Sequence, residues 1–129
     1  MKVLLDTHAV LWAARAPERL GPAARAVIER LSTKRLVSDA SCWELGIKFA
    51  KGKLPEAQTL LERWDELLAS LAAAPLAVGT THALLAPRLD WGHPDPFDRV
   101  LAAQAITEGA VFVSRDAAFD AVEGLERIW

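Results

Sequence analysis

The stretch KVLLD, residues 2 to 6, is a short apolar run that ends in an aspartate. An apolar run of this length without polar alternation is typical of a strand that is buried on both faces. Such strands occur in parallel sheets, where the crossover from one strand to the next is usually a helix that covers the sheet. The stretch therefore predicts a strand of a parallel sheet, with Asp6 at the carboxyl end of that strand.

Further apolar stretches of this kind alternate with helical patterns along the chain. The predicted strands are residues 2–6, 35–39, 75–79, 110–116 and 125–129. The predicted helices are one that follows residue 6 and those over residues 22–31, 40–52, 56–73, 81–89 and 96–108. This alternation predicts an α/β fold of three layers, α/β/α, around a mainly parallel sheet, and we expect a single domain over residues 1–129.

Two proline-containing segments mark expected boundaries. The stretch RAPERLGP, residues 15 to 22, contains two prolines and a glycine and is predicted to be a loop. The longest predicted helix lies within residues 56–73, where leucines and Trp64 recur at helical spacing, and Pro75 is expected to end it.

The composition bounds the class of protein. With 129 residues, 52% hydrophobic and 25% charged, the chain has a globular profile. A single cysteine, Cys42, excludes an internal disulfide, and the first apolar run is too short for a signal peptide or a membrane span, so we expect a cytoplasmic protein. The formal net charge of −2 offers no general attraction for nucleic acid, so local charge must decide whether a polyanion binds.

The stretch HPDPFDRVLAAQA, residues 93 to 105, places two aspartates and two prolines before a helical pattern. Asp95 followed by Pro96 has the form of an N-cap with proline at the first helical position. Asp98 then falls in the first turn, where a carboxylate interacts favourably with the helix dipole. Stabilisation of the helix start is therefore enough to explain both acids. Whether either of them also belongs to an active site depends on the rest of the chain.

Acidic residues lie near the ends of several predicted strands. Asp6 ends the first strand, Glu44 lies in the helix after the second, and Asp116 comes just after the apolar part of the fourth strand, AVFVS at residues 110–114. Asp98 begins the helix that leads into that last strand. Because ligand sites in parallel α/β sheets form at the carboxyl ends of strands, these four acids are expected at one edge. Clustered carboxylates repel unless a cation neutralises them, and oxygen ligands favour Mg²⁺ or Mn²⁺ over zinc.

Each of these acids also has a local explanation. Asp6 and Asp116 can cap the helices that follow them, and Glu44 can form a favourable ion pair with Lys48 one turn later. The local explanations account for each acid separately but not for the presence of all four at one edge of the sheet. The three histidines have no spacing typical of a zinc site, and His8 is expected to make a local hydrogen bond beside Asp6.

Several motifs, in this order, resemble those of PIN-domain proteins of the VapC toxin kind. They are LLDTHAVLW at residues 4–12, SDASCWELGIKFAKGKL at 38–54, HPDPFDRVLAAQA at 93–105, FVSRD at 112–116 and the terminal IW. The resemblance spans nearly the whole chain and implies a Mg²⁺- or Mn²⁺-dependent endoribonuclease that a cognate VapB antitoxin inhibits. Carried over residue by residue, the family's acids fall on Asp6, Glu44, Asp98 and Asp116, and a threonine common in the family is replaced by Ser114.

The expected chemistry is metal-assisted hydrolysis of an RNA phosphodiester bond. Asp6, Asp98 and Asp116 are expected to hold one or two ions, with Glu44 binding an ion directly or through another ligand. The preference for RNA over DNA follows from the resemblance alone. Side chains expected to contact the substrate are Ser114, Arg99, Arg115 and Lys48, with surface ion pairing as the alternative for the arginines.

The resemblance also implies partners. An antitoxin segment that offers a cation is expected to cover the acidic edge, and a chain with five tryptophans and 52% hydrophobic residues is expected to form a homodimer through an exposed apolar patch.

Four alternatives compete with this interpretation, two of them within the PIN fold and two outside it. The chain can be a PIN nuclease of RNA processing outside a toxin–antitoxin pair, or a catalytically silent PIN module that only binds. A haloacid-dehalogenase phosphatase or a receiver domain also places an aspartate after its first strand, but the former needs a second aspartate where this chain has His8. The latter needs an acidic pair after that strand, which is missing here.

Overall fold

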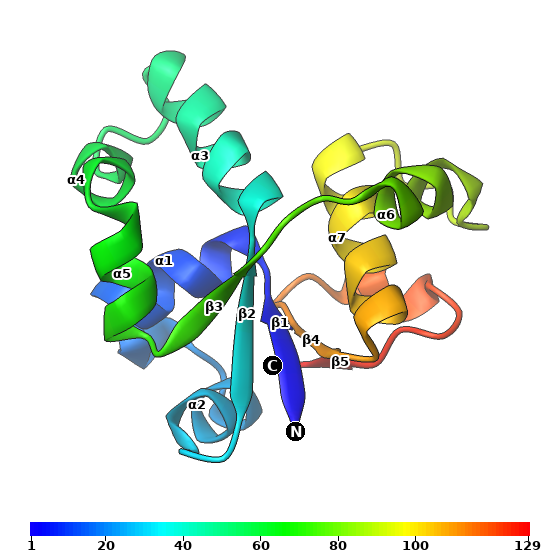
Figure 1. Ribbon diagram of the computed structural model, residues 1–129, viewed down its shortest axis with the longest axis horizontal. Helices are drawn as coiled ribbons and strands as arrows, with labels where there is room; N and C mark the ends of the chain where they lie inside the picture. The colour runs from blue at the N-terminus through cyan, green and yellow to red at the C-terminus, as the bar shows by residue number, and fades with distance from the viewer.

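The computed structural model describes residues 1–129 and has five parallel strands with helices on both faces of the sheet (Figure 1). The strands are β1 (Lys2–Leu5), β2 (Lys34–Ser38), β3 (Ala73–Leu76), β4 (Val111–Val113) and β5 (Arg127–Ile128), in the spatial order β3-β2-β1-β4-β5. The α-helices are α1 (Thr7–Arg15), α2 (Pro22–Glu29), α3 (Asp39–Ala50), α4 (Ala57–Glu62), α5 (Trp64–Ser70), α6 (Thr80–Leu85) and α7 (Pro96–Glu108). Three short 3₁₀ helices are η1 (Pro17–Arg19), η2 (Ala86–Arg88) and η3 (Ala117–Ala121). The expected three-layer α/β/α fold is thus confirmed.

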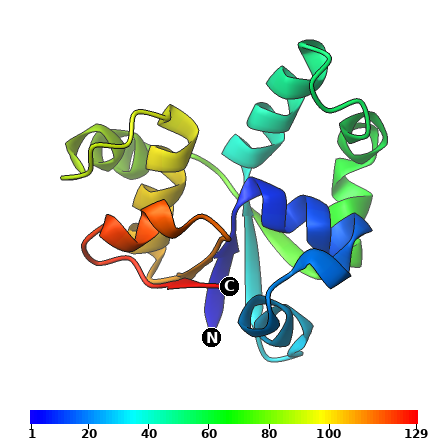
Figure 2. The same ribbon diagram turned by 180° about the vertical axis from the view of Figure 1, so that it is seen from behind.

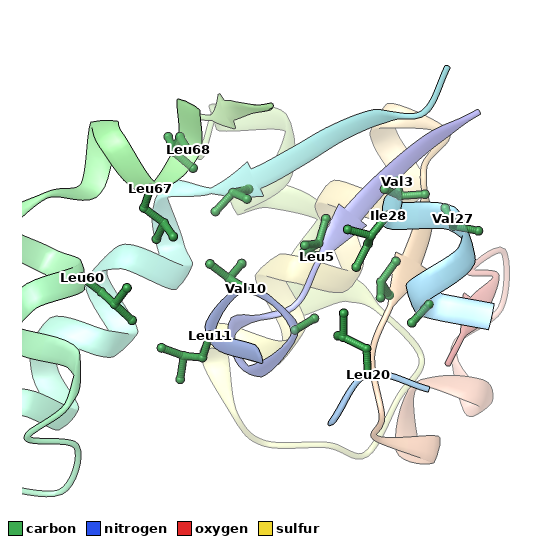
Figure 3. Packing of buried hydrophobic residues seen from close by; sticks show 14 of the residues in the cluster. Val3, Leu5, Val10, Leu11, Leu20, Val27, Ile28, Leu60, Leu67 and Leu68 are labelled. Atoms are coloured by element: carbon green, nitrogen blue, oxygen red, sulfur yellow. The ribbon is translucent and has the colours of Figure 1, made fainter. Parts of the chain in front are cut away.

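Strand β1 lies at the centre of the sheet and is buried on both faces. Val3 and Leu5 point into one core with residues of α1, α2, α4 and α5, as Figure 3 shows. Leu4, between them, points into a second core with Phe112 of β4 and residues of α7. This alternation explains why KVLLD carries no polar residue at positions 3 to 5, because a polar side chain there would enter one of the two cores.

The predicted helix over residues 56–73 is in fact two helices. The backbone leaves the helical region at Arg63 (φ −124°, ψ 39°), between α4 and α5. Leu60 of α4 and Leu67 of α5 still enter the same core, so the apolar spacing continues through the break. The helical pattern therefore indicates which face is buried but not the interruption, and the longest helix is α7 with 13 residues.

Pro75 does not follow a helix but lies within β3, which begins two residues earlier than the expected strand of residues 75–79. It is paired with Val37 of β2. Strand β3 is the edge of the sheet, so the missing amide proton of Pro75 faces no further strand. The last strand is also shorter than expected, with two residues in place of the five of residues 125–129.

Two glycines provide a matched test of packing. A Cβ atom on Gly21 would lie 2.5 Å from the carbonyl carbon of Trp129, whereas a Cβ atom on Gly46, inside α3, would have no atom within 4 Å. Gly21→Ala is therefore expected to lower the free energy of unfolding by about 1–3 kcal/mol. Gly46→Ala is expected to raise it by about 0.5–1 kcal/mol, because alanine is the better helix former. Urea denaturation measures both, and equal effects of the two substitutions would contradict the packing of Trp129 on Gly21.

None of the helices combines the length and apolar character needed to cross a membrane.

Candidate active site

The four predicted acids converge on one cavity at the carboxyl ends of the strands. Asp6 follows β1, Asp116 follows β4, Glu44 lies in α3 and Asp98 lies in the first turn of α7. All four line a cavity of about 170 Å³. Seen from behind, α1 and η3 leave neighbouring strands at this edge of the sheet (Figure 2). The structure therefore brings together acids that lie up to 110 residues apart in the sequence.

Asp6 caps α1 and also faces the cavity. One carboxylate oxygen accepts a hydrogen bond of 2.7 Å from the Ala9 amide, and the other accepts one of 2.5 Å from the Ser114 hydroxyl. The Ser114 oxygen in turn accepts a hydrogen bond from the Asp116 amide at 3.1 Å. Burial raises the pKa of the Asp6 carboxyl, against the hydrogen bonds from Ser114 and Ala9, which lower it. Asp6 therefore has both predicted roles, because it caps α1 and also lies beside the other acids of the cavity.

Glu44 is buried in the wall of the cavity and is held from two sides. The Thr7 hydroxyl, itself buried and 3.0 Å from the Ser41 hydroxyl, donates to Glu44 Oε1 at 2.6 Å. Lys48 Nζ lies 3.1 Å from Glu44 Oε2, so the expected ion pair of one helical turn is present. Since Thr7 comes from α1 and Lys48 from α3, the carboxylate orientation depends on both helices. Sequence reasoning missed Thr7, whose only signal was its position next to Asp6.

Asp95 and Asp98 divide the roles at the start of α7. The Asp95 carboxylate caps the helix, accepting hydrogen bonds from the amides of Phe97 (2.8 Å) and Asp98 (3.4 Å), as predicted. The Asp98 carboxylate points away from the cap and its Oδ2 lies 2.6 Å from His93 Nε2. Burial raises the pKa of Asp98 from its ordinary 3.8 to about 6, with the hydrogen bond to His93 opposing the shift and the Asp95 charge adding to it.

His93 is a site residue that sequence reasoning missed, although it lies only five positions before Asp98 in the same motif. Its ring stacks on Trp91, with centroids 4.5 Å apart and planes 15° from parallel. Trp91 in turn contacts Phe119 of the core, with ring centroids 5.1 Å apart. A chain of aromatic contacts therefore anchors the imidazole that holds the Asp98 carboxylate.

Arg99 is predicted from the sequence to contact substrate phosphate, but the structure assigns it to the loop before α7. Its guanidinium donates hydrogen bonds to five backbone carbonyls, those of Ala86, Pro87, Leu89, Trp91 and His93. All three nitrogens are engaged, so no donor remains directed toward a phosphate. Arg99 therefore fixes the loop that carries His93.

The other side of the cavity opens into a hollow of about 480 Å³. Asp6, His8, Arg115 and Asp116 line it. Asp116 is exposed and also caps η3 through the Ala118 amide, at 2.9 Å. Arg115 is exposed and forms no ion pair, so its guanidinium is free to bind an anion beside the acids. His8 forms no side-chain hydrogen bond, contrary to the prediction, and its ring lies beside that of Trp12, with 5.5 Å between the centroids.

The donor atoms around the cavity suit a hard divalent cation. They are the carboxylate oxygens of Asp6, Glu44, Asp98 and Asp116, which are the ligands that Mg²⁺ and Mn²⁺ prefer. Burial raises the pKa of the Asp6 and Asp98 carboxyls, so a nearby cation would favour their charged forms. Each acid is engaged with a neighbouring residue of its own, and no three acidic, imidazole or thiol groups form a preassembled coordination sphere.

The family model of the PIN domain matches residues 3–125. The chain belongs to the PIN domain family. A comparison with curated protein sequences gave no significant match. The match of the family model includes all four acids of the cavity, from Asp6 to Asp116, and the strands that position them.

Solved structures share the fold of this PIN domain over almost its whole length. A chain of the crystal structure of VapBC2 from Rickettsia felis, bound to a DNA fragment from their promoter, aligns with a TM-score of 0.74 and 18% identity, covering 99% of this chain and 98% of that one. DNA-bound VapBC from Salmonella typhimurium aligns with a TM-score of 0.66, 18% identity and coverage of 99% and 97%. FitAcB from Neisseria gonorrhoeae aligns with a TM-score of 0.63, 19% identity and coverage of 100% and 97%. At these identities the likeness concerns the fold.

Proposed function

We propose that this PIN domain is a metal-dependent endoribonuclease and the toxin of a VapBC-type toxin–antitoxin pair that acts on cytoplasmic RNA. The observation that supports hydrolysis of a phosphodiester is the cavity lined by four carboxylates, with Arg115 on one side and Lys48 on the other. A polyanion that crosses this edge places one phosphate at the acids and the neighbouring phosphates near the cations. The matches to chains of VapBC complexes support the toxin assignment.

In the proposed mechanism Asp6, Asp98 and Asp116 would hold Mg²⁺ or Mn²⁺, and Glu44 would bind the ion itself or one of its ligands. A cation bound there would activate water for attack on the phosphodiester and would stabilise the negative charge of the transition state. Ser114 holds Asp6, His93 holds Asp98 and Thr7 holds Glu44, so that these three carboxylates are each oriented by a side-chain hydrogen bond. Arg115 binds a phosphate oxygen of the substrate.

The experiment that tests the function is cleavage of a fluorogenic single-stranded RNA by the purified protein. Cleavage is expected with added Mn²⁺ or Mg²⁺ and is expected to fall to background in EDTA, because the carboxylates of the cavity repel a phosphate unless a cation lies between them. A DNA strand of the same sequence, tested in parallel, reports whether RNA is preferred. Equal cleavage in EDTA and in Mn²⁺ contradicts metal dependence, and intact RNA under all conditions favours the alternative of a silent binding module.

Two partners belong to the same proposal. A VapB-type antitoxin is proposed to cover the acidic cavity with a cationic side chain, since the partly buried carboxylates of Asp6 and Asp98, whose pKa values are raised, would be stabilised by an added positive charge. A homodimer is proposed because the chain leaves large apolar side chains exposed, such as Leu84, 57% of which is accessible to solvent. Light scattering of the protein alone and after co-expression with an antitoxin measures both assemblies. A nuclease that acts alone in RNA processing remains the second candidate, and an antitoxin complex with full activity would favour it.

A further inference from the structure

Trp43 is an unusual aromatic residue because it is largely exposed. It lies in α3 next to Glu44, and 67% of its surface is accessible to solvent. Its ring meets the edge of Phe97 of α7, with centroids 5.1 Å apart and planes at 76°. Burying the large apolar surface of a tryptophan side chain stabilises a protein. The other four tryptophans of the chain are partly buried, as this predicts, and Trp43 is the exception. Neither the core nor the acid cavity accounts for the position of Trp43.

The Trp43 ring forms one wall of an apolar pocket of about 290 Å³. The other walls are Ala40, Val78, Pro96, Phe97 and Val100, with Asp39 at the border. The pocket lies between α3 and α7, the two helices that carry Glu44 and Asp98. Its position relative to the acids is therefore set by the same helices.

A groove lined by lysines connects this pocket with the acid cavity. The groove, of about 450 Å³, contains Lys48, Lys51 and Lys53. It shares Glu44, Lys48 and Asp95 with the acid cavity, and Pro96 and Phe97 with the Trp43 pocket. Lys51 and Lys53 are exposed and form no ion pair. Acids, cations and an exposed aromatic ring therefore follow one another along one continuous surface.

This order corresponds to the chemistry of a single-stranded nucleic acid. Its backbone presents phosphates, which pair with lysines, and its bases present flat π faces, which stack on exposed aromatic rings. A base in the pocket can place its face on Trp43 while its polar edge stays toward the solvent. A peptide that filled the pocket with an apolar side chain would leave the two unpaired lysines of the groove without a function.

We propose that the Trp43 pocket is a base-binding subsite for single-stranded RNA, separated from the scissile phosphate by the phosphates that the lysine groove binds. The inference rests on the proposed nuclease function and adds to it a position at which the RNA is held. A base in this pocket determines which bond of the strand reaches the acids. The subsite therefore contributes to the choice of the cleavage site.

The test measures RNA binding without cleavage. All variants carry Asp98→Asn, which removes a proposed metal ligand and one negative charge from the cavity, and the probe is a fluorescein-labelled single-stranded RNA of about eight nucleotides followed by anisotropy. Adding Trp43→Ala is expected to weaken binding about 10-fold, and Trp43→Phe, which keeps an aromatic face, by less than about 3-fold. Leu31→Ala, at a position 96% exposed between α2 and β2, is the matched control and is expected to change nothing.

A second experiment identifies which base of the RNA occupies the Trp43 pocket. In a set of RNAs that each lack one base, loss of the base at one position is expected to weaken binding of the Asp98→Asn protein about 10-fold. The same RNA is expected to bind the Asp98→Asn/Trp43→Ala protein no worse than the intact RNA does, because the stacking partner is already absent.

Equal RNA affinity with and without Trp43 overturns the subsite, as does an Asp98→Asn protein that binds no single-stranded RNA. If Trp43→Ala leaves RNA binding unchanged but dissociates the homodimer or the antitoxin complex, the pocket is a protein contact and the proposal is wrong. The proposed nuclease function is tested by a separate experiment. It fails if the wild-type protein with Mn²⁺ leaves RNA intact, and the binding measurements with the Asp98→Asn protein do not depend on that result.

Discussion

Asp98→Asn is expected to lower RNA cleavage in Mn²⁺ by about 100-fold or more while leaving the protein folded. Asparagine keeps the shape of the side chain and an oxygen that accepts the hydrogen bond from His93, but it lacks the negative charge that a hard cation requires. Loss of a residue that only supports a metal ligand typically costs about 10–100-fold, so loss of a ligand itself is expected to reach at least the upper end of this range. Initial cleavage rates at saturating Mn²⁺ measure the effect.

The same substitution is expected to stabilise the protein without metal. The pKa of Asp98 is raised from 3.8 to about 6, so the folded protein holds a proton more tightly than the unfolded chain does. The free energy of unfolding of the wild-type protein therefore falls as the pH rises from about 4 to about 6, and stays lower above that window. Asp98→Asn removes this loss and is expected to be more stable by about 1–2 kcal/mol at about pH 7 in EDTA, as measured by urea denaturation.

Asp95→Asn is the matched control within the same turn. This substitution is expected to keep the cap of α7, since asparagine is among the best N-cap residues, and to leave cleavage and Mn²⁺ affinity close to those of the wild-type protein. An Asp98→Asn protein that cleaves normally would contradict the assignment of Asp98. So would inactivity of Asp95→Asn alone, because the roles of the two aspartates would then be exchanged.

The second large effect concerns Arg99. Arg99→Met is expected to lower the free energy of unfolding by about 2–4 kcal/mol, because five backbone carbonyls of η2 and of the loop between η2 and α7 lose a charged donor. Arg99→Lys is expected to recover only part of this loss, since an ammonium group lacks the planar fork of the guanidinium. The loop also carries His93, so cleavage by the folded fraction is expected to fall about 10-fold or more. Urea denaturation and initial cleavage rates measure the two effects.

Arg88→Met is the control for this loss of charge. Arg88 lies at the end of η2, is exposed and makes no side-chain hydrogen bond, so its replacement is expected to change stability by less than about 0.5 kcal/mol. If Arg99→Met is as stable as Arg88→Met, the carbonyl contacts of Arg99 do not hold the loop, and phosphate binding by Arg99 is the role to test next.

Local patterns in the sequence are sufficient to predict the elements around the site. The apolar run before Asp6 predicts β1, and the sequence Asp95-Pro96 predicts the cap of α7, because each pattern is satisfied by residues a few positions apart. The ends of strands also predict that the four acids share one edge, since parallel strands all end on the same side. The acids of the cavity are therefore predictable before any contact between them is known.

The orientation of those acids is decided only by the tertiary structure. The hydrogen bond between Ser114 and Asp6 joins residues 108 positions apart, and that between Thr7 and Glu44 joins residues 37 apart. Both depend on β1 lying beside β4 and β2, an order that no local pattern encodes. The edge position of Pro75 and the hydrogen bonds of Arg99 likewise depend on which elements lie side by side. Periodicity and capping depend on neighbours along the chain, whereas the partner of a polar side chain depends on which elements pack against it in space.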